Sequence, residues 1–265
     1  MAEIMKKSGQ WSEVLNIVLF FKALRNKKID LWYQPQYDLA TKEIVGFEAL
    51  LRWKIADNEY VPPLELISFA EKNGLITNLD IYVVEKFCED FKSLLLVPRV
   101  NKEKLRVAIN ISGTSFKNRE IMRYIEYLIQ KNNISSMNLE FELTETSVIN
   151  DKDIYSISET VFELRKKGYS VALDDFGTGY SNLALLSQVS VDVLKIDKSF
   201  LQGTEKTNKI LDGILFLTKS LNLKTIGEGI ETQEQEEFLI NKGCDIGQGY
   251  LFSKPLPLNN LLCNS

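Results

Sequence analysis

The sequence predicts an α/β protein that folds as a single TIM-like (β/α)8 barrel, with its first strand antiparallel to the others. The first observation is a series of about eight short apolar segments with strand-like character, the number that closes such a barrel. The second is that helix-like segments separate the strands from the second one onward, which requires those strands to run parallel. The third is the short connection Leu39–Glu43, which makes the first two strands an antiparallel hairpin.

The individual elements follow from the same periodicities. Apolar residues at helical spacing predict an N-terminal helical extension over residues 1–28, and residues 29–265 are predicted to form the barrel. Gly168 marks the end of one helix, and Thr232 and Gln235 have the spacing of a capping box before another. The expected strands are 31–38, 44–53, 105–112, 139–145, 171–173, 193–197, 224–230 and 247–252. The expected helices are 62–73, 79–95, 116–131, 154–167, 208–221 and one that ends at 242.

Composition limits the class of protein. Of the 265 residues, 45% are hydrophobic and 26% are charged, and the net charge of −4 argues against binding a nucleic acid polymer or an anionic lipid surface. The apolar run Ile17–Phe21 is too short to span a bilayer and the polar Met1–Gln10 is not a secretory signal, so no membrane insertion is expected. Three scattered cysteines without CxxC spacing indicate a reducing compartment, which we expect to be the cytoplasm.

The chain contains no histidine. This excludes Ser-His and Cys-His catalysis, and it removes the usual ligands of zinc. A hydrolase of this composition would have to activate water with hard cations held by oxygen ligands, or with a carboxylate or lysine base.

Two adjacent aspartates, Asp174 and Asp175, follow the apolar run Val171–Leu173. Adjacent carboxylates repel each other unless a cation lies between them, so such a pair at the end of a buried strand suggests a metal site. The alternative is that one aspartate caps the next helix while the other is solvated. Glu48 raises the same question, because it lies in the middle of the apolar strand 44–53, where an unpaired carboxylate is costly.

In (β/α)8 barrels the chemistry lies at the carboxyl ends of the strands, where the loops converge. Six carboxylates and only one cation occur among the unusual polar residues at these ends, which are Glu48, Asn110, Glu142, Asp174, Asp175, Lys195, Glu228, Glu231 and Gln248. Two divalent cations together with Lys195 would roughly neutralise this group, and an oxygen-rich set without histidine favours Mg²⁺ or Mn²⁺ over zinc. Each residue also has a structural interpretation, as a surface acid, a salt-bridge partner, a turn cap or a lysine that extends to solvent. Their joint occurrence at successive strand ends favours the metal site.

A series of motifs along the chain is similar to those of bacterial EAL-domain cyclic di-GMP phosphodiesterases, over roughly residues 25–257. The matching segments are GFEALLRW at 46–53, Asn110–Ser112, Glu142–Glu145, Asp174–Tyr180, Lys195–Asp197, Glu228–Thr232 and Gln248–Tyr250. Gly227 and Ile230 stand where other residues are more common in the family, and neither change removes an expected ligand.

This resemblance implies a barrel with an antiparallel first strand and a mouth that binds cyclic di-GMP and two Mg²⁺ or Mn²⁺ ions. One ion would be held by Glu48, Asn110, Glu142 and Asp174, and the other by Asp174, Asp175 and Glu228. A water shared by the ions would open the ring to linear 5'-pGpG, and the implied catalytic residues are Glu48, Asp175, Lys195 and Glu231. The implied substrate contacts are Gln34, Arg52 and Gln248. Glu145 would position a lid formed by residues 176–186, which contributes to a homodimer in the family.

Two other functions stay open at this point. A catalytically idle EAL domain could act as a cyclic di-GMP receptor or a protein-interaction module. Idle members of the family lose metal ligands or the lid motif, whereas this chain retains each position. A two-metal phosphodiesterase for another cyclic dinucleotide is the third reading, because metals and lysine contact phosphate rather than base.

Overall fold

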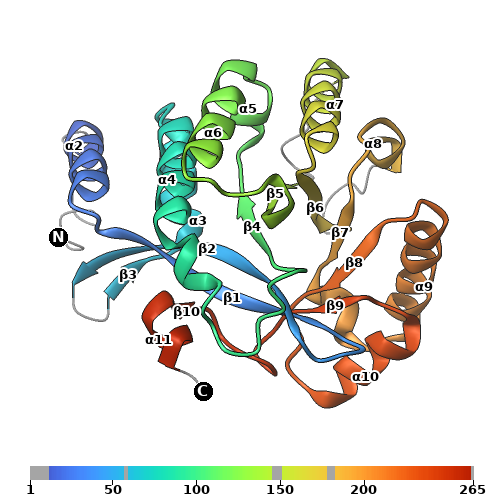
Figure 1. Ribbon diagram of the computed structural model, residues 1–265. Coiled ribbons are helices and arrows are strands. Elements are labelled where there is room, and N and C mark those ends of the chain that lie inside the picture. Colours follow the sequence, from blue (N-terminus) through green and yellow to red (C-terminus); the bar gives the residue numbers. More distant parts are fainter. Residues whose placement is uncertain (1–11, 57–58, 145–150, 178–182, 264–265) are drawn as a thin grey trace.

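Eight strands of the computed structural model close into a barrel with helices around its outside (Figure 1). The structure describes residues 12–56, 59–144, 151–177 and 183–263. The order around the barrel is β1-β9-β8-β7-β6-β5-β4-β2, and β2 pairs with β1 to close it. Strand β1 is antiparallel to both of its barrel neighbours, whereas the other pairings within the barrel are parallel. The predicted fold class, with its reversed first strand, is therefore confirmed.

The strands lie close to their predicted positions. The barrel strands are β1 (Ile29–Asp38), β2 (Ile44–Ala56), β4 (Arg106–Asn110), β5 (Leu139–Thr144), β6 (Ser170–Phe176), β7 (Val193–Ile196), β8 (Lys224–Gly227) and β9 (Ile246–Gly247). Two short strands outside the barrel, which the sequence did not indicate, are β3 (Glu59–Val61) beside β2 and β10 (Leu256–Pro257) beside β1.

Helices connect the strands in the expected order. They are α2 (Ser12–Arg25), α3 (Pro63–Lys72), α4 (Ile76–Leu94), α5 (Gly113–Phe116), α6 (Arg119–Lys131), α7 (Asp151–Lys166), α8 (Leu183–Gln188), α9 (Glu205–Ser220), α10 (Gln233–Lys242) and α11 (Leu258–Cys263). Two 3₁₀ turns span Ser136–Asn138 and Lys198–Gln202. The capping box of Thr232 and Gln235 is present at the start of α10, and Gly168 follows α7 with a φ of 91°.

Three predicted elements differ from the structure. The helix expected over 116–131 is divided between α5 and α6, because the Asn118 side chain accepts hydrogen bonds from two backbone N–H groups and begins a new helix. Strand β8 ends at Gly227 rather than at 230, since the chain turns at Gly229 with a φ of 63°. The strand expected over 247–252 stops at Gly247 and is followed by turns.

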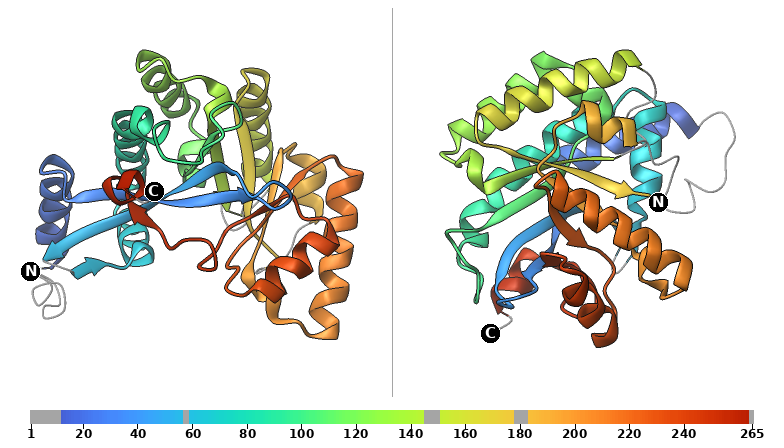
Figure 2. Two further views of the ribbon diagram at one scale, coloured as in Figure 1. Left: turned by 60° about the horizontal axis from the view of Figure 1, so that its bottom comes forward. Right: turned by 90° about the vertical axis from the view of Figure 1, so that its right-hand side faces the viewer.

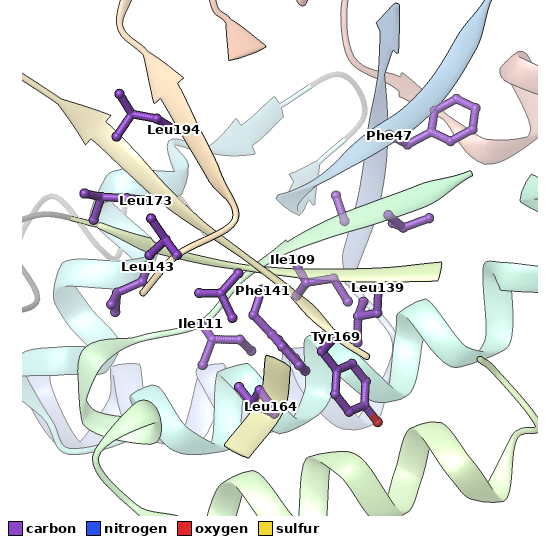
Figure 3. Close-up of a cluster of buried hydrophobic side chains, with 14 of the residues drawn as sticks. Phe47, Ile109, Ile111, Leu139, Phe141, Leu143, Leu164, Tyr169, Leu173 and Leu194 are labelled. Carbon is purple, nitrogen blue, oxygen red and sulfur yellow. The ribbon is translucent and has the colours of Figure 1, made fainter. Parts of the chain in front are cut away.

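The alternation along the strands divides apolar from polar side chains. Outward residues such as Ile109, Phe141 and Leu143 pack between the sheet and the helices, where Leu164 of α7 joins them (Figure 3). Burying each of these side chains stabilises the fold by roughly 1.5–3 kcal/mol. The residues between them therefore point into the barrel, and this places several acids inside it.

Helix α2 packs on the domain as expected for the N-terminal extension. Phe20 is fully buried, and it shares a second apolar cluster with Ile29, Trp53 and Val61 from the β1–β3 end of the sheet. The views agree that α2 lies on the side of the molecule away from α9 and α10 (Figure 2). The boundary at residue 28 stays a prediction. Within the described part of the chain, no helix combines the length and apolarity needed to cross a bilayer.

Candidate metal centre

Parallel pairing aligns the polar residues at the carboxyl ends of neighbouring strands. Asn110 of β4 lies opposite Glu142 of β5, and Asp174 of β6 lies opposite Thr144, two residues farther along β5. Glu228 follows β8, and its backbone N–H donates to the carbonyl oxygen of Ile196, which fixes it beside the end of β7. The side chains predicted from separate motifs are therefore brought to one mouth of the barrel.

Two groups of carboxylates form in this mouth. The first contains Glu48, Glu142 and Asp174, and the second contains Asp174, Asp175 and Glu228. In each group one oxygen from every residue lies within 4.8 Å of the others. Asp174 belongs to both groups, so the two candidate cation positions adjoin each other.

A β-bulge allows both aspartates to reach the same group. Consecutive residues of a strand normally point to opposite faces, which would separate Asp174 from Asp175. Here the pairing of β6 with β7 shifts register between Leu173 and Phe176, and Asp175 has a φ of 57°. A residue other than glycine in this left-handed conformation costs about 1–2 kcal/mol. Such local strain is typical of a functional site rather than of a strand built for stability.

Lys195 of β7 lies at the centre of the carboxylates. Its side chain is fully buried, and its Nζ is 2.8 Å from Glu142 Oε1 and 2.9 Å from Glu228 Oε1. The same nitrogen is 3.2 Å from Asp174 Oδ2 and 3.5 Å from Glu48 Oε1. One ammonium group thus contacts four carboxylates, three of them on β2, β5 and β6 and the fourth on the residue that follows β8.

The surroundings shift the pKa values of these groups. Burial raises the pKa of Glu142 well above its usual value, and the Glu48 and Asp174 charges add to this while Lys195 opposes it. Burial likewise raises the pKa of Glu228 to about 8. For Lys195 burial alone would lower the pKa, but the surrounding carboxylates outweigh it and raise that pKa well above its usual value. The lysine is therefore charged, and Glu142 and Glu228 hold protons more tightly than ordinary carboxyl groups do.

The donor set fits divalent cations. Five carboxylates and one ammonium group leave four negative charges when all are ionised, which two divalent ions would balance. Despite their proximity, Lys195 Nζ and Glu142 Oε1 complete no hydrogen bond of good geometry, so the buried charges are not satisfied by the protein alone. Asn110 Nδ2 donates to Glu142 Oε2 (2.9 Å) and Glu48 Oε1 (3.3 Å), and its amide would have to turn to offer Oδ1 to a cation.

Metal binding at this centre should weaken as the pH falls. Burial raises the pKa of Glu228 to about 8, and the pKa values of Glu142 and Asp175 are also raised, so protons compete with a cation for these oxygens as the pH falls. Calorimetric titration of chelator-treated protein with Mn²⁺ should give an affinity that rises from about pH 6 to about pH 9, with release of protons. An affinity that does not change over this range would show that these carboxyl groups are not the ligands.

Two predicted substrate contacts, Gln34 and Gln248, adjoin the first group. Gln248 Nε2 donates to Glu48 Oε2 and to Gln34 Oε1, the latter at 3.1 Å. Gln34 Nε2 in turn donates to the carbonyl oxygen of Ser253 at 3.0 Å. The third, Arg52, is half-buried, with its guanidinium carbon 5.4 Å from the centre of the Trp32 ring.

Two predicted residues are not brought to the acids. Glu231 is exposed at the start of α10, its backbone N–H donates to Gln235 Oε1 (2.8 Å), and its carboxylate joins neither group. Glu145 lies outside the described residues, as do residues 178–182 of the expected lid. The roles assigned to Glu231, Glu145 and the lid stay predictions.

The structure adds Asp80, which the motifs did not indicate. Asp80 lies on the buried face of α4, and its Oδ2 accepts hydrogen bonds from Ser112 Oγ (2.6 Å), Ser115 Oγ (2.7 Å) and Ser112 N (3.2 Å). It thereby ties α4 to the segment that directly follows Asn110. An acid among the apolar positions of an amphipathic helix was the available signal.

Replacing Asp80 by asparagine should stabilise the fold by about 1–3 kcal/mol near pH 8 and have little effect near pH 4. Burial raises the pKa of Asp80 to about 6, and the two serine hydroxyl groups offset this only in part. A carboxyl group with a raised pKa destabilises the fold as the pH rises through that value, whereas an amide oxygen still accepts the same hydrogen bonds. Urea unfolding at both pH values measures the difference. A variant less stable than the wild type at the higher pH would contradict this.

Comparison with known proteins identifies the family. The EAL domain family model matches residues 20–255. The cyclic di-GMP phosphodiesterase NbdA of Pseudomonas aeruginosa is 36% identical over 243 residues, which are 89% of this chain and 30% of the relative. The probable cyclic di-GMP phosphodiesterase PdeB of Escherichia coli is 35% identical over 240 residues, 91% of this chain and 45% of the relative. The chain thus spans less than half the length of either relative.

Solved structures agree with this comparison. The EAL enzyme Bd1971, in its cAMP- and cyclic di-GMP-bound form, has a TM-score of 0.87 and 30% identity, covering 99% of this chain and 71% of its own. The PaMucR phosphodiesterase in complex with c-di-GMP has a TM-score of 0.82 and 30% identity, covering 92% of this chain and 98% of its own. From the family match, the fold and the predicted motifs at one barrel mouth, we conclude that the chain belongs to the EAL domain family.

Proposed function

We propose that the chain is a metal-dependent phosphodiesterase that hydrolyses cyclic di-GMP to linear 5'-pGpG. The observation that carries this proposal is the pair of carboxylate groups that share Asp174 around the buried Lys195. Relatives that are named cyclic di-GMP phosphodiesterases, and the c-di-GMP complex of PaMucR, support the substrate.

The donor set assigns the residues that would hold the cations. Glu48, Glu142 and Asp174, with Asn110 after its amide turns, would hold one, and Asp174, Asp175 and Glu228 would hold the other. When bound, two Mg²⁺ or Mn²⁺ ions supply the charge that lowers the pKa of a water and polarises a phosphate group.

The remaining residues bind and orient. The Lys195 ammonium group, charged and shielded from solvent, stabilises negative charge that develops on the phosphoryl oxygens and orients the attacking water. The Arg52 guanidinium, held beside Trp32, offers N–H donors to a phosphate oxygen of the substrate. Gln34 and Gln248 add buried amide groups next to Glu48.

Incubation of the purified chain with cyclic di-GMP and either Mg²⁺ or Mn²⁺ tests the proposal, with products resolved by chromatography. We expect linear pGpG, formed only with added metal and abolished by a chelator. Tight binding of cyclic di-GMP without turnover would instead identify a receptor. Equal turnover of cyclic di-AMP would identify a less specific phosphodiesterase.

The proposal includes a homodimer in the cytoplasm. An apolar groove of about 780 Å³ next to β6 is lined by side chains that include Leu186, Phe200, Leu217 and the exposed Phe216. Covering such a surface with a second copy of the chain would remove it from water. The described cysteines, Cys88, Cys244 and Cys263, form no disulfide, which fits a reducing compartment. Light scattering tests the dimer.

A further inference from the structure

Three buried glutamines form a chain of hydrogen bonds inside the barrel and end on Glu48. Gln36 Nε2 donates to Gln248 Oε1 at 2.9 Å. Gln248 Nε2 donates to Glu48 Oε2 and to Gln34 Oε1. Gln34 and Gln36 come from β1 and Gln248 follows β9, and each is at least 90% buried. Gln36 lies outside the motifs that identified the site.

The direction of these hydrogen bonds is fixed by two groups that can only accept. Glu48 Oε2 accepts a hydrogen bond from Gln248, so the NH₂ group of Gln248 faces it. The carbonyl oxygen of Ser253 requires the NH₂ group of Gln34, which leaves Gln34 Oε1 to face Gln248. Gln248 Oε1 is therefore turned toward Gln36, and the partner at that position has to be a donor.

Gln36 packs closely against Gly46 of the neighbouring strand β2. A Cβ atom at Gly46 of β2 would lie 2.5 Å from Gln36 Oε1, so the glycine leaves room for this side chain. Beneath it is a cavity of about 280 Å³ at the amino-terminal ends of the strands, lined by Gln36 together with Arg106 and Glu140. Gln36 thus lies between Gln248 and the polar side chains that line this cavity. Without Gln36, the amide of Gln248 would be free to turn toward those side chains.

This arrangement gives the two carboxylate oxygens of Glu48 different partners. Oε2 accepts from Gln248, whereas Oε1 lies 3.5 Å from Lys195 Nζ and 3.3 Å from Asn110 Nδ2. We propose that Gln36 is a positioning residue: by donating to Gln248 Oε1 it keeps the Gln248 NH₂ group on Glu48 and so directs the other Glu48 oxygen toward the cation. The inference rests on the metal site of the proposed function.

Binding of Mn²⁺ alone to the full chain, measured by calorimetry at about pH 8, tests this role without turnover. Gln36→Met keeps the length of the side chain but removes the donor, so the Gln248 amide is free to turn. Loss of a group that contacts a ligand directly typically weakens metal binding roughly 10- to 100-fold. Gln36 acts on Glu48 through Gln248, so we expect a loss at the lower end of that range, about tenfold. Gln36→Glu places an acceptor against Gln248 Oε1 and should weaken binding at least as much. Gln130→Glu adds the same charge on the exposed face of α6 and should bind as the wild type does.

Three results would overturn the inference. The first is binding within threefold of the wild type in Gln36→Met or, should that variant not fold, in Gln36→Glu. The second is a loss of affinity that occurs only together with a lower Tm in chelator, since it would then reflect the fold rather than the orientation of Glu48. The third is a wild-type chain that binds no Mn²⁺, which would remove the proposed function as well. Weaker binding at an unchanged Tm supports the role.

Discussion

Replacing Lys195 by methionine should strongly reduce turnover and also destabilise the metal-free protein. The ammonium group lies within 3.5 Å of oxygens of Glu48, Glu142, Asp174 and Glu228. Among the described residues no other cation forms an ion pair with these acids, so without Lys195 their repulsion is not offset. Removing one partner of a buried ion pair costs about 3–5 kcal/mol. Loss of a cation aimed at the reacting group lowers kcat by roughly 10²–10³-fold. Urea unfolding in chelator measures the first effect, and the chromatographic assay measures the second.

The matched control for this variant is Lys209→Met. Lys209 also forms an ion pair, with Nζ 2.7 Å from Glu205 Oε1, but the two side chains are 74% and 84% exposed. Exposed pairs of this kind contribute about 0–1 kcal/mol, so the control should unfold almost as the wild type does and keep its activity. Added Mn²⁺ should restore part of the stability of Lys195→Met, because cations replace the missing positive charge. If Lys195→Met were as stable as the wild type in chelator, the acids could not be repelling one another as described.

Replacing Glu142 by glutamine should abolish turnover and metal binding, yet leave the metal-free protein as stable as the wild type or more so. Burial raises the pKa of Glu142 well above its usual value, so the ionised form is disfavoured in the fold. The wild-type protein loses stability as the pH rises through the raised pKa of Glu142, because the buried carboxyl group then ionises. The glutamine amide does not ionise, so the variant does not lose this stability. The gain should therefore grow toward alkaline pH and vanish in acid. Unfolding in chelator at several pH values, beside Mn²⁺ titration, measures both effects.

The two variants together separate catalysis from folding. Both lose activity, but the lysine variant destabilises the metal-free protein and the glutamate variant does not. A glutamate variant that keeps the wild-type affinity for Mn²⁺ would remove Glu142 from the ligand set. A fall in stability that is the same at every pH would mean that Glu142 acts through packing or hydrogen bonds instead of charge.

Much of the fold and of the candidate site was predictable because strand periodicity fixes which side chains share a face. The alternation around Phe141 placed Glu142 inside the barrel, and the run before Asp174 placed the aspartates at a strand end. The short turn after β1 gave the reversed first strand. These features depend on local sequence alone, so they could be predicted before the structure was known.

What the sequence could not predict depends on contacts between distant elements. Nothing in the residues around Asp175 signals its left-handed conformation, which arises where β6 loses register with β7. Asp80 and Gln36 act through partners that are 32 and 212 residues away in the chain. The alternation of Gln34 and Gln36 on one face of β1 was visible, but their partner from the end of the barrel was not.

Diffraction from crystals grown in Mn²⁺, collected at an energy where manganese scatters anomalously, shows directly whether two cations occupy the barrel mouth. We expect two anomalous peaks per chain, one among Glu48, Glu142 and Asp174 and the other among Asp174, Asp175 and Glu228. We also expect Lys195 Nζ to move out of contact with at least one of its present carboxylate partners as the cations take up the negative charge. A barrel mouth without anomalous peaks, in which Lys195 still contacts all four acids, would contradict the two-cation site.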